Sequence, residues 1–405
     1  MLDAYIYDGL RSPIGGIAGK LASVRPDDLA SELIRALVAR SPFQPHQVED
    51  VLLGCTNQAG EDSRNVARHA GLLANLPVEV AGITVNRLCA SGLAAVVDAA
   101  RAVTCREGDL LIAGGVETMS RAPFAIAKAE RPYSRSIKIH DTTIGARFPN
   151  PRLIAEHGND SMPETADNVA RELNIAREEA DAFAVASQAK YMAAKTAGFY
   201  DGEIHPISVP AGKKKPPVVV AEDEHPRPQT TLDMLEKLPS LFDGGVVTAG
   251  NACGLNDGAA VLLIGSRDMG ERANIEPIGR VVASAVVGVP PRIMGLGPVP
   301  AIHKVLERAG LSLKEIDVIE INEAFAVQVL GCLKQLGLSA ADARVNPNGG
   351  AIALGHPLGC SGARLALTAL RQLHRTGGRY ALVTLCIGVG QGLAVIIERE
   401  RGKAR

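Results

Sequence analysis

The chain has 405 residues, of which 46% are hydrophobic and 21% are charged, a balance that allows a large core and favours two or three domains. Its formal net charge of −1 gives no general electrostatic reason to bind nucleic acid or an anionic membrane. We therefore expect neither kind of partner, and any anionic ligand must be met by local groups.

The seven cysteines are scattered and odd in number, and they form no Cys-x-x-Cys pair. This pattern argues against a disulfide framework and against a structural zinc site, so we expect free thiols in a reducing compartment and no metal. The first residues indicate a strand rather than a signal peptide, and no apolar run is expected to reach the length of a membrane span. The sequence thus predicts a cytoplasmic protein.

Strands and helices alternate in the first part of the chain. The apolar pattern predicts, in order, a helix over Leu29 to Ala39, a strand over Val48 to Gly54, a turn bearing Cys89, an alanine-rich helix to about Val103 and a strand over Asp109 to Gly115. The strands are continuous apolar runs, which are typical of parallel sheets with helices on both faces.

From about Arg121 to Gly244 the composition of the chain changes. Many charges and prolines surround one clear predicted helix, Arg177 to Ala194. This composition favours an inserted lid over a third core, and long insertions on a rigid scaffold often form binding surfaces. Ordinary surface decoration is the alternative.

The last part of the chain repeats the order of the first. The predicted elements are a helix over Ala301 to Ala309, a strand over Ile316 to Ile321, a turn bearing His356, a helix over Ser361 to Leu373 and a strand over Tyr380 to Leu385. We infer two homologous α/β halves packed together. Chance similarity between generic βαβ units is the alternative.

Cys89 is the first candidate for chemistry. Small residues after it lead into the apolar helix, so its sulfur is predicted to lie at a helix N-terminus, where free backbone N–H groups favour the thiolate and lower the thiol pKa. The same N–H groups could hold an oxyanion. A buried structural cysteine is the alternative interpretation.

His356 lies between Gly355 and Pro357, so a stiff turn presents its ring. Such presentation suits a general base, whereas a histidine that caps its own turn, or one that shares a metal with Cys360, is the alternative. Cys386 ends the predicted strand Tyr380 to Leu385 and faces a glycine-rich segment that opens into another strand, Leu393 to Glu398; α/β folds place ligands at such strand ends.

Asn322 ends the strand Ile316 to Ile321. The repeat predicts that it reaches the same face as Cys89, His356 and Cys386. A helix cap is its alternative role.

Four motifs, taken together, resemble those of the thiolase family in order and spacing: Asn86 to Gly92, Asn322 to Phe325, Gly355 to Gly359 and Cys386 to Gly392. The resemblance covers essentially the whole chain. It implies a duplicated five-layer α-β-α-β-α architecture with an inserted loop domain. The implied domains are an N-terminal half (1–120 plus 245–270, with the strand Ala259 to Gly265), a loop domain that binds CoA (121–244) and a C-terminal half (271–405).

The resemblance also implies residue roles. Cys89 would be the nucleophile that forms an acyl-enzyme, and His356 would activate it and later the thiol of coenzyme A. Cys386 would exchange the proton at the α-carbon of acetyl-CoA. Asn322, through a water held with His356, would stabilise the enolate oxygen, and the N–H groups of Cys89 and Gly388 would form an oxyanion hole.

Three further segments look most like those of 3-oxoadipyl-CoA thiolases: Lys138 to Phe148, Asp160 to Asn168 and Asn346 to Leu354. Such enzymes convert 3-oxoadipyl-CoA and CoA into succinyl-CoA and acetyl-CoA in the breakdown of aromatic compounds. Arg147 or Lys138 would meet the free carboxylate of the substrate. The alternatives are an acetyl-CoA C-acetyltransferase, a fatty-acid 3-ketoacyl-CoA thiolase and a non-catalytic protein that binds acyl-CoA.

The resemblance makes CoA a co-substrate, with no permanently bound cofactor, and implies a homo-oligomer, a tetramer or a dimer. Arg227 would meet adenine or phosphate, and Met162 and Phe325 would line the pantetheine channel. Cys253 stands where the family commonly has serine, which puts a side-chain hydrogen bond to pantetheine in doubt. Ala90 and Cys360 also depart from the common family pattern.

Overall fold

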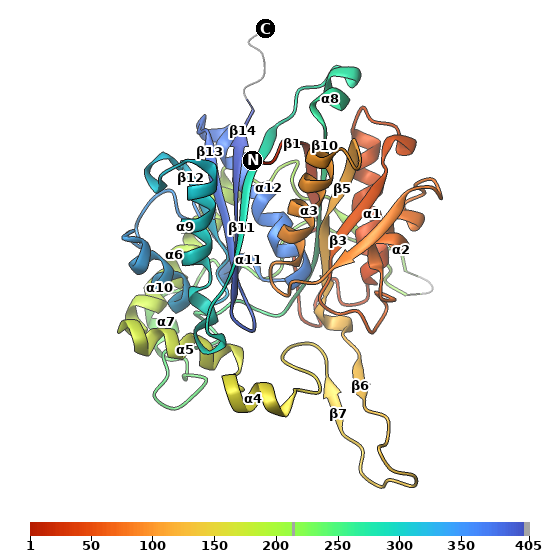
Figure 1. The fold of residues 1–405 in the computed structure, drawn as a ribbon. Coiled ribbons are helices and arrows are strands. Elements are labelled where there is room, and N and C mark those ends of the chain that lie inside the picture. Colours follow the sequence, from red (N-terminus) through yellow and green to blue (C-terminus); the bar gives the residue numbers. More distant parts are fainter. Residues whose placement is uncertain (213–214, 401–405) are drawn as a thin grey trace.

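The computed structural model describes residues 1–212 and 215–400, so the end of the predicted C-terminal half, 401–405, lies outside it. Ten strands form one sheet, in the order β12-β13-β14-β11-β1-β10-β5-β3-β4, with the short β2 (Gly15–Gly16) beside β10 (Figure 1). The strands of the first half are β1 (Ala4–Arg11), β3 (Asp50–Gly54), β4 (Ala81–Val85), β5 (Leu110–Thr118) and β10 (Asn256–Gly265). Those of the second half are β11 (Gly279–Gly288), β12 (Val318–Ile321), β13 (Tyr380–Ile387) and β14 (Gln391–Arg399).

The strand β1 belongs to both halves of this sheet. It pairs antiparallel with β10 from Tyr5 to Arg11, and its first residues, Ala4 to Ile6, also pair with β11. Parallel pairing is confined to β3 with its neighbours β4 and β5, and to β12 with β13. The expectation of parallel sheets therefore holds only at the two outer ends, because β10, β1, β11 and β14 pair antiparallel and are still buried on both faces.

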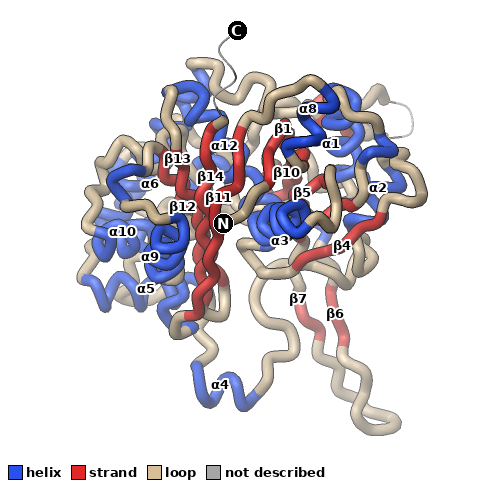
Figure 2. The backbone as a smooth tube through the Cα atoms, turned by 45° about the horizontal axis from the view of Figure 1, so that its top comes forward, coloured by secondary structure: helices blue, strands red, loops and turns tan. Residues whose placement is uncertain are grey.

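Helices and the two parts of the sheet alternate as layers (Figures 1 and 2). The helices α3 (Ser91–Cys105) and α12 (Leu358–Thr376) lie between the two parts, and their apolar residues share one core with both. The outer face of the first part is covered by α1 (Pro26–Arg40) and α2 (Val66–Leu73), and that of the second by α9 (Pro298–Ala309) and α10 (Ala326–Leu336). These layers confirm the predicted five-layer architecture.

The first turns of α3 and α12 are in direct backbone contact. A Cβ on Gly92 would lie 2.4 Å from the carbonyl oxygen of Gly359, and a Cβ on Gly362 would lie 2.3 Å from the backbone nitrogen of Leu93. No side chain fits at such distances, so glycine is required at both crossing points. The contact places the two turns that precede these helices, those of Cys89 and His356, next to each other.

One stretch, Leu88–Cys105, is long and apolar enough by composition to cross a membrane. The expectation that no apolar run reaches this length is therefore wrong. The stretch contains α3, and 61% of it is buried inside the protein. A helix enclosed between two layers of sheet must be apolar on nearly all sides, which explains its composition.

The segment between the halves contains more regular structure than its charges and prolines indicated. The predicted helix Arg177 to Ala194 is α6 (Arg177–Thr196), and further elements are β6 (Phe124–Ile126), β7 (Ile139–Asp141), α4 (Pro151–His157), α5 (Met162–Leu173), β8 (Ile207–Val209), β9 (Val218–Val220) and α7 (Leu232–Glu236). The strands β6 and β7 form an arm that projects from the body (Figure 1). Apolar residues of α5 and of the first part of α6 join the core of the second half, whereas Tyr191 and Ala194 of α6 belong to a smaller cluster with Phe199 and Tyr200. The remaining helices are α8 (Arg267–Ala273) and α11 (Ala351–Leu354).

Candidate active site

Three cysteines from distant parts of the chain lie together. Cys89 precedes α3, Cys386 lies near the end of β13, and Cys253 lies in the loop before β10. Burial is the main cause that raises the pKa of Cys253 and of Cys386, and the nearby Cys89 raises both further. Cys89 and Cys386 are thus brought to one place, as the repeat indicated.

The turn that carries Cys89 is held in an uncommon conformation. Leu88 adopts a left-handed φ of 46°, which side chains with a Cβ rarely adopt. The backbone N–H of Leu88 donates to Oδ1 of Asn86 at 3.0 Å, and Oγ of Ser91 donates to the carbonyl of Leu88 at 2.6 Å. The N–H of Arg87 donates to the same Oγ at 2.8 Å. These bonds fix where the sulfur of Cys89 points.

Burial determines the ionisation of Cys89. The residue keeps some exposure, but protein surrounds its sulfur, and this loss of hydration raises the thiol pKa to about 11. The backbone N–H of Gly388, which faces the sulfur, lowers the pKa by less. The expectation that the helix N-terminus lowers this pKa is therefore wrong, because desolvation outweighs the N–H groups. A base must take the proton when the sulfur attacks.

His356 is buried and held at three atoms. Its backbone N–H donates to Oδ1 of Asn256 at 2.9 Å, its Nδ1 lies 2.6 Å from Oγ of Ser361, and its Nε2 lies 3.3 Å from Nδ2 of Asn322. Since Ser361 donates its hydroxyl proton to the carbonyl of Pro357 at 2.9 Å, its oxygen is left to accept from Nδ1–H. The ring is then neutral with its lone pair on Nε2, facing Asn322.

Burial, aided by the charge of Arg364, lowers the pKa of His356 to about 3. The imidazole is therefore uncharged near neutral pH, and Nε2 keeps its lone pair. The resting pair of Cys89 and His356 is neutral, with the proton on sulfur.

Cys386 is fully buried, and burial is the main cause that raises its pKa well above the ordinary thiol value. Gly388 follows in the tight turn between β13 and β14. A Cβ there would lie 3.2 Å from Cδ1 of Leu88 and 3.7 Å from Sδ of Met162. This turn therefore packs against the Cys89 turn, and Met162 borders the same site.

Two loops of the site run side by side. The N–H of Cys253 donates to the carbonyl of Ala324 at 3.0 Å, and Ala252 forms a β-bridge with Phe325. Asn322, at the end of β12, is anchored by its backbone N–H to the carbonyl of Thr384 at 3.0 Å. Asn322, Phe325 and Cys253 thus lie around the ends of β12 and β13.

Three predicted binding residues belong to the inserted segment rather than to the turns that carry the thiols. Arg227 is exposed, with its backbone N–H donating to Oε1 of Gln188 at 2.9 Å. Arg147 donates to the carbonyl of Thr142 at 2.7 Å and lies near Asp62, whose pKa is raised by burial and lowered in part by the charge of Arg147. Lys138 is exposed at the end of the arm, next to β7. None of the hydrogen bonds of these three described side chains reaches the thiols.

Sequence reasoning missed two residues that hold His356. Ser361 lies five positions after the histidine, one turn into α12, so the spacing could have revealed it. Asn256 lies 100 positions away, in the other half, and gives no local signal. A Cβ on Gly355 would lie 2.5 Å from its side chain, which explains the glycine before the histidine.

Known proteins resemble this chain along its whole length. Residues 4–268 match the model of the thiolase N-terminal domain, and residues 275–399 match that of the thiolase C-terminal domain. The chain belongs to the thiolase family. The predicted family is thereby confirmed, and with it an acyltransferase enzyme.

Among its thiolase relatives, the 3-oxoadipyl-CoA/3-oxo-5,6-dehydrosuberyl-CoA thiolase of Escherichia coli K12 is 57% identical, over 98% of this chain and 100% of the relative. The beta-ketoadipyl-CoA thiolase of Pseudomonas putida is 54% identical with the same coverage. Among solved structures, the acetyl-CoA acetyltransferase of Bacillus anthracis superposes with a TM-score of 0.92 at 38% identity, covering 99% of both chains. Human mitochondrial 3-ketoacyl-CoA thiolase in complex with CoA superposes with a TM-score of 0.90 at 39% identity, covering 98% of both.

Proposed function

We propose that this thiolase cleaves 3-oxoadipyl-CoA with CoA into succinyl-CoA and acetyl-CoA. The observation that supports the proposal is that Cys89 and Cys386, from separate motifs, lie together, and that His356 contacts Asn322, whose backbone is bonded to the strand of Cys386. The choice of substrate is supported by the names of relatives that are 54% to 57% identical over nearly the whole chain.

In the first step, the sulfur of Cys89 attacks the ketone carbon of the 3-oxoacyl-CoA, and its proton passes to Nε2 of His356. The N–H groups of Cys89 and Gly388 hold the oxyanion that forms. The bond between C2 and C3 then breaks, which leaves the acyl group on Cys89 and an electron pair on the enolate of acetyl-CoA. Asn322, through a water shared with His356, stabilises the enolate oxygen.

Cys386 then gives its proton to C2 of the enolate, which releases acetyl-CoA, and the proton held by His356 restores the Cys386 thiol. The raised pKa of Cys386 supports this role, because an acid must keep its proton until the carbanion forms. In the second step, CoA gives its thiol proton to His356 and attacks the acyl group. Cys89 leaves as thiolate and takes the proton back.

The substrate can be tested by steady-state thiolysis. We expect kcat/KM for 3-oxoadipyl-CoA to exceed that for acetoacetyl-CoA by at least about tenfold, since a partner for the buried tail carboxylate is worth ~1.4 kcal/mol or more. Our candidate for the group that binds this carboxylate is Arg147. Its Nε is buried and makes no hydrogen bond to the described residues. Arg147→Gln should remove most of the preference and leave acetoacetyl-CoA cleavage unchanged, whereas Lys138→Gln on the exposed arm serves as the matched control. A preference for acetoacetyl-CoA would contradict the substrate assignment.

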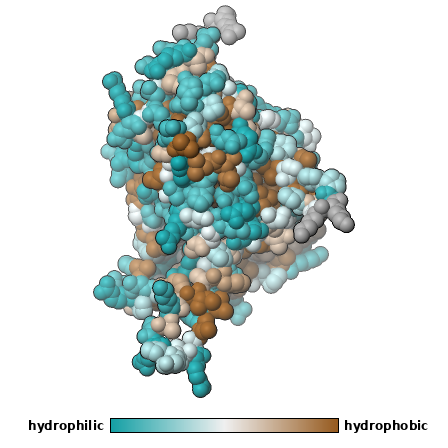
Figure 3. Space-filling model, turned by 90° about the vertical axis from the view of Figure 1, so that its right-hand side faces the viewer, coloured by the Kyte–Doolittle hydropathy of each residue, from teal (hydrophilic) through white to brown (hydrophobic). Residues whose placement is uncertain are grey.

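We also propose a cytoplasmic homo-oligomer, a tetramer or a dimer. The arm supports it, because Phe124, Ile126, Tyr133 and Ile139 on and between β6 and β7 are all more than half exposed. Figure 3 shows apolar surface on the projecting lower part of the molecule, where the arm lies. Light scattering after size exclusion should give a mass two or four times that of one chain, and a monomer would contradict the proposal. Fractionation of the producing cells tests the location.

A further inference from the structure

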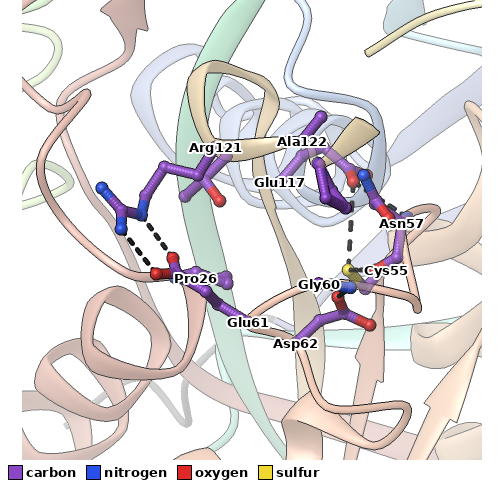
Figure 4. A pocket seen from close by; sticks show the side chains of 11 residues that line it. Pro26, Cys55, Asn57, Gly60, Glu61, Asp62, Glu117, Arg121 and Ala122 are labelled. Carbon is purple, nitrogen blue, oxygen red and sulfur yellow. Dashed lines mark hydrogen bonds and ion pairs between the residues drawn. The ribbon is translucent and has the colours of Figure 1, made fainter. Parts of the chain in front are cut away.

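Glu117, near the end of β5, is a buried carboxylate whose bonds lead to both halves of the site. Its side chain is only 4% exposed. Its Oε2 accepts from the backbone N–H of Thr56 at 3.0 Å and of Gly359 at 2.9 Å, and its Oε1 accepts from that of Asn57 at 3.2 Å. Figure 4 shows this side chain directed at Cys55 and Asn57 across a small pocket.

From Glu117, a continuous chain of hydrogen bonds leads to the Cys89 turn. The carbonyl of Thr56, whose N–H binds Glu117, accepts from Nδ2 of Asn86 at 3.2 Å. The other end of the Asn86 amide, Oδ1, accepts the N–H of Leu88 and so supports the left-handed residue before the nucleophile. A displacement of Thr56 is therefore passed directly to the backbone that carries Cys89.

The other bond of Glu117 leads to the His356 turn. Gly359 lies three residues after His356, in the first turn of α12, where the backbone N–H groups lack partners within the helix. Asn256 binds the N–H of His356 itself, so the first half holds this turn at both ends. Without Glu117, the Gly359 N–H would be buried with no acceptor.

The acceptor at this position must be a carboxylate. N–H donors face both oxygens, and only an ionised side chain offers lone pairs on both. Glutamine would offer one acceptor oxygen and would turn an NH₂ group toward at least one of these donors. Burial raises the pKa of Glu117, while the N–H groups of Thr56, Gly359 and Asn57 act in the opposite direction.

We propose that Glu117 is a positioning residue that fixes the turn of Cys89 relative to the turn of His356. The proposal rests on the function proposed above, in that these turns carry nucleophile and base. Glu117 acts through the backbone and does not touch the reacting atoms.

The test begins with Glu117→Gln, measured beside Glu61→Gln. Glu61 lines the same pocket but binds the side chains of Arg121 and Arg25, and neither turn. For Glu117→Gln we expect kcat to fall about 10- to 100-fold with KM for CoA within about twofold, as a misplaced reacting group affects the chemical step. The rate at which acetyl-CoA loads Cys89 should fall by the same factor, and Glu61→Gln should behave as wild type. A wild-type loading rate in Glu117→Gln overturns the proposal.

A second measurement separates positioning from general damage. The charge of Glu117 raises the pKa of Cys89, so its removal should leave the rate of alkylation by iodoacetamide at fixed pH unchanged or higher. Loading by acetyl-CoA should fall in the same variant. If both rates fall together, the side chain merely supports the fold, and the proposal is wrong.

Asn86→Ala keeps the three N–H bonds of Glu117 and breaks only the chain to Leu88, so it tests the same route if Glu117→Gln does not fold. We expect slower loading in Asn86→Ala and, in the double variant, a loss smaller than the product of the single losses. Independent, multiplicative losses would contradict the proposed route. Loading by acetyl-CoA does not depend on which 3-oxoacyl-CoA is cleaved, and a wild-type protein that never loads Cys89 would instead refute the proposed function.

Discussion

His356→Ala is expected to abolish the acylation of Cys89. The thiol has a pKa of about 11, so almost none of it is ionised near neutral pH, and the attack on a thioester or ketone needs a base in place. The hydrogen bonds of Ser361 and Asn322 orient the ring of His356, which carries its lone pair on Nε2. Loss of a general base costs about 10²- to 10⁴-fold in rate, and here both steps use it.

The measurement is intact-protein mass spectrometry after mixing with acetyl-CoA, together with steady-state thiolysis. Wild type should gain one acetyl group at Cys89 within the mixing time, and His356→Ala should gain none on that scale. His303→Ala, which removes an exposed histidine of α9, is the control and should load normally. Rapid loading of His356→Ala would show that another group activates the thiol.

Cys386→Ala should separate acyl transfer to Cys89 from cleavage of the carbon–carbon bond. Transfer of an acetyl group from acetyl-CoA to Cys89 requires no proton at carbon, so this variant should load Cys89 within about tenfold of the wild-type rate. Cleavage of a 3-oxoacyl-CoA needs an acid for the carbanion, and we expect its rate to fall by about 10³-fold or more. The site is closed to bulk water around this fully buried thiol, so solvent should not replace it.

Cys332→Ala is the matched control for this experiment. Cys332 is also fully buried and close enough to raise the pKa of Cys386, but its thiol donates to the carbonyl of Gly295 and takes no part in the proposed steps. It should retain both loading and cleavage. If Cys386→Ala still cleaved 3-oxoadipyl-CoA at a rate near that of wild type, the acid would have to be sought elsewhere.

Much of the fold was predictable because its strands and helices are continuous apolar or amphipathic runs. The predicted helix Ser361 to Leu373 lies inside α12, and the predicted strand Tyr380 to Leu385 lies inside β13. The helices α2, α4, α5, α7, α8, α10 and α11 were not predicted. The helix α5 has an amphipathic pattern, but charges and prolines surround it in the sequence, and its apolar residues are buried against the second half.

In the candidate site, too, some residues could be predicted from the sequence and others could not. Cys89, His356 and Cys386 were found because each lies in a short run of small residues, glycine and proline that restricts the backbone locally. Asn256 and Glu117 act on the His356 turn across 100 and 242 positions of sequence, so only the folded chain shows their partners. The pKa of Cys89 could not be predicted from its helix N-terminus, since the surrounding protein that desolvates the sulfur comes from distant segments.

The strand β1 pairs with strands of both halves, and this affects when it can fold during synthesis. Tyr5 pairs with Gly265 and Ala4 with Val281, so the first strand to leave the ribosome must wait for more than half of the chain to be translated. Until then it is an unpaired edge, open to the wrong partner or to a chaperone. The last contacts of β1 form only after β11 has emerged, and a nascent chain halted at the end of the first half would still expose that edge.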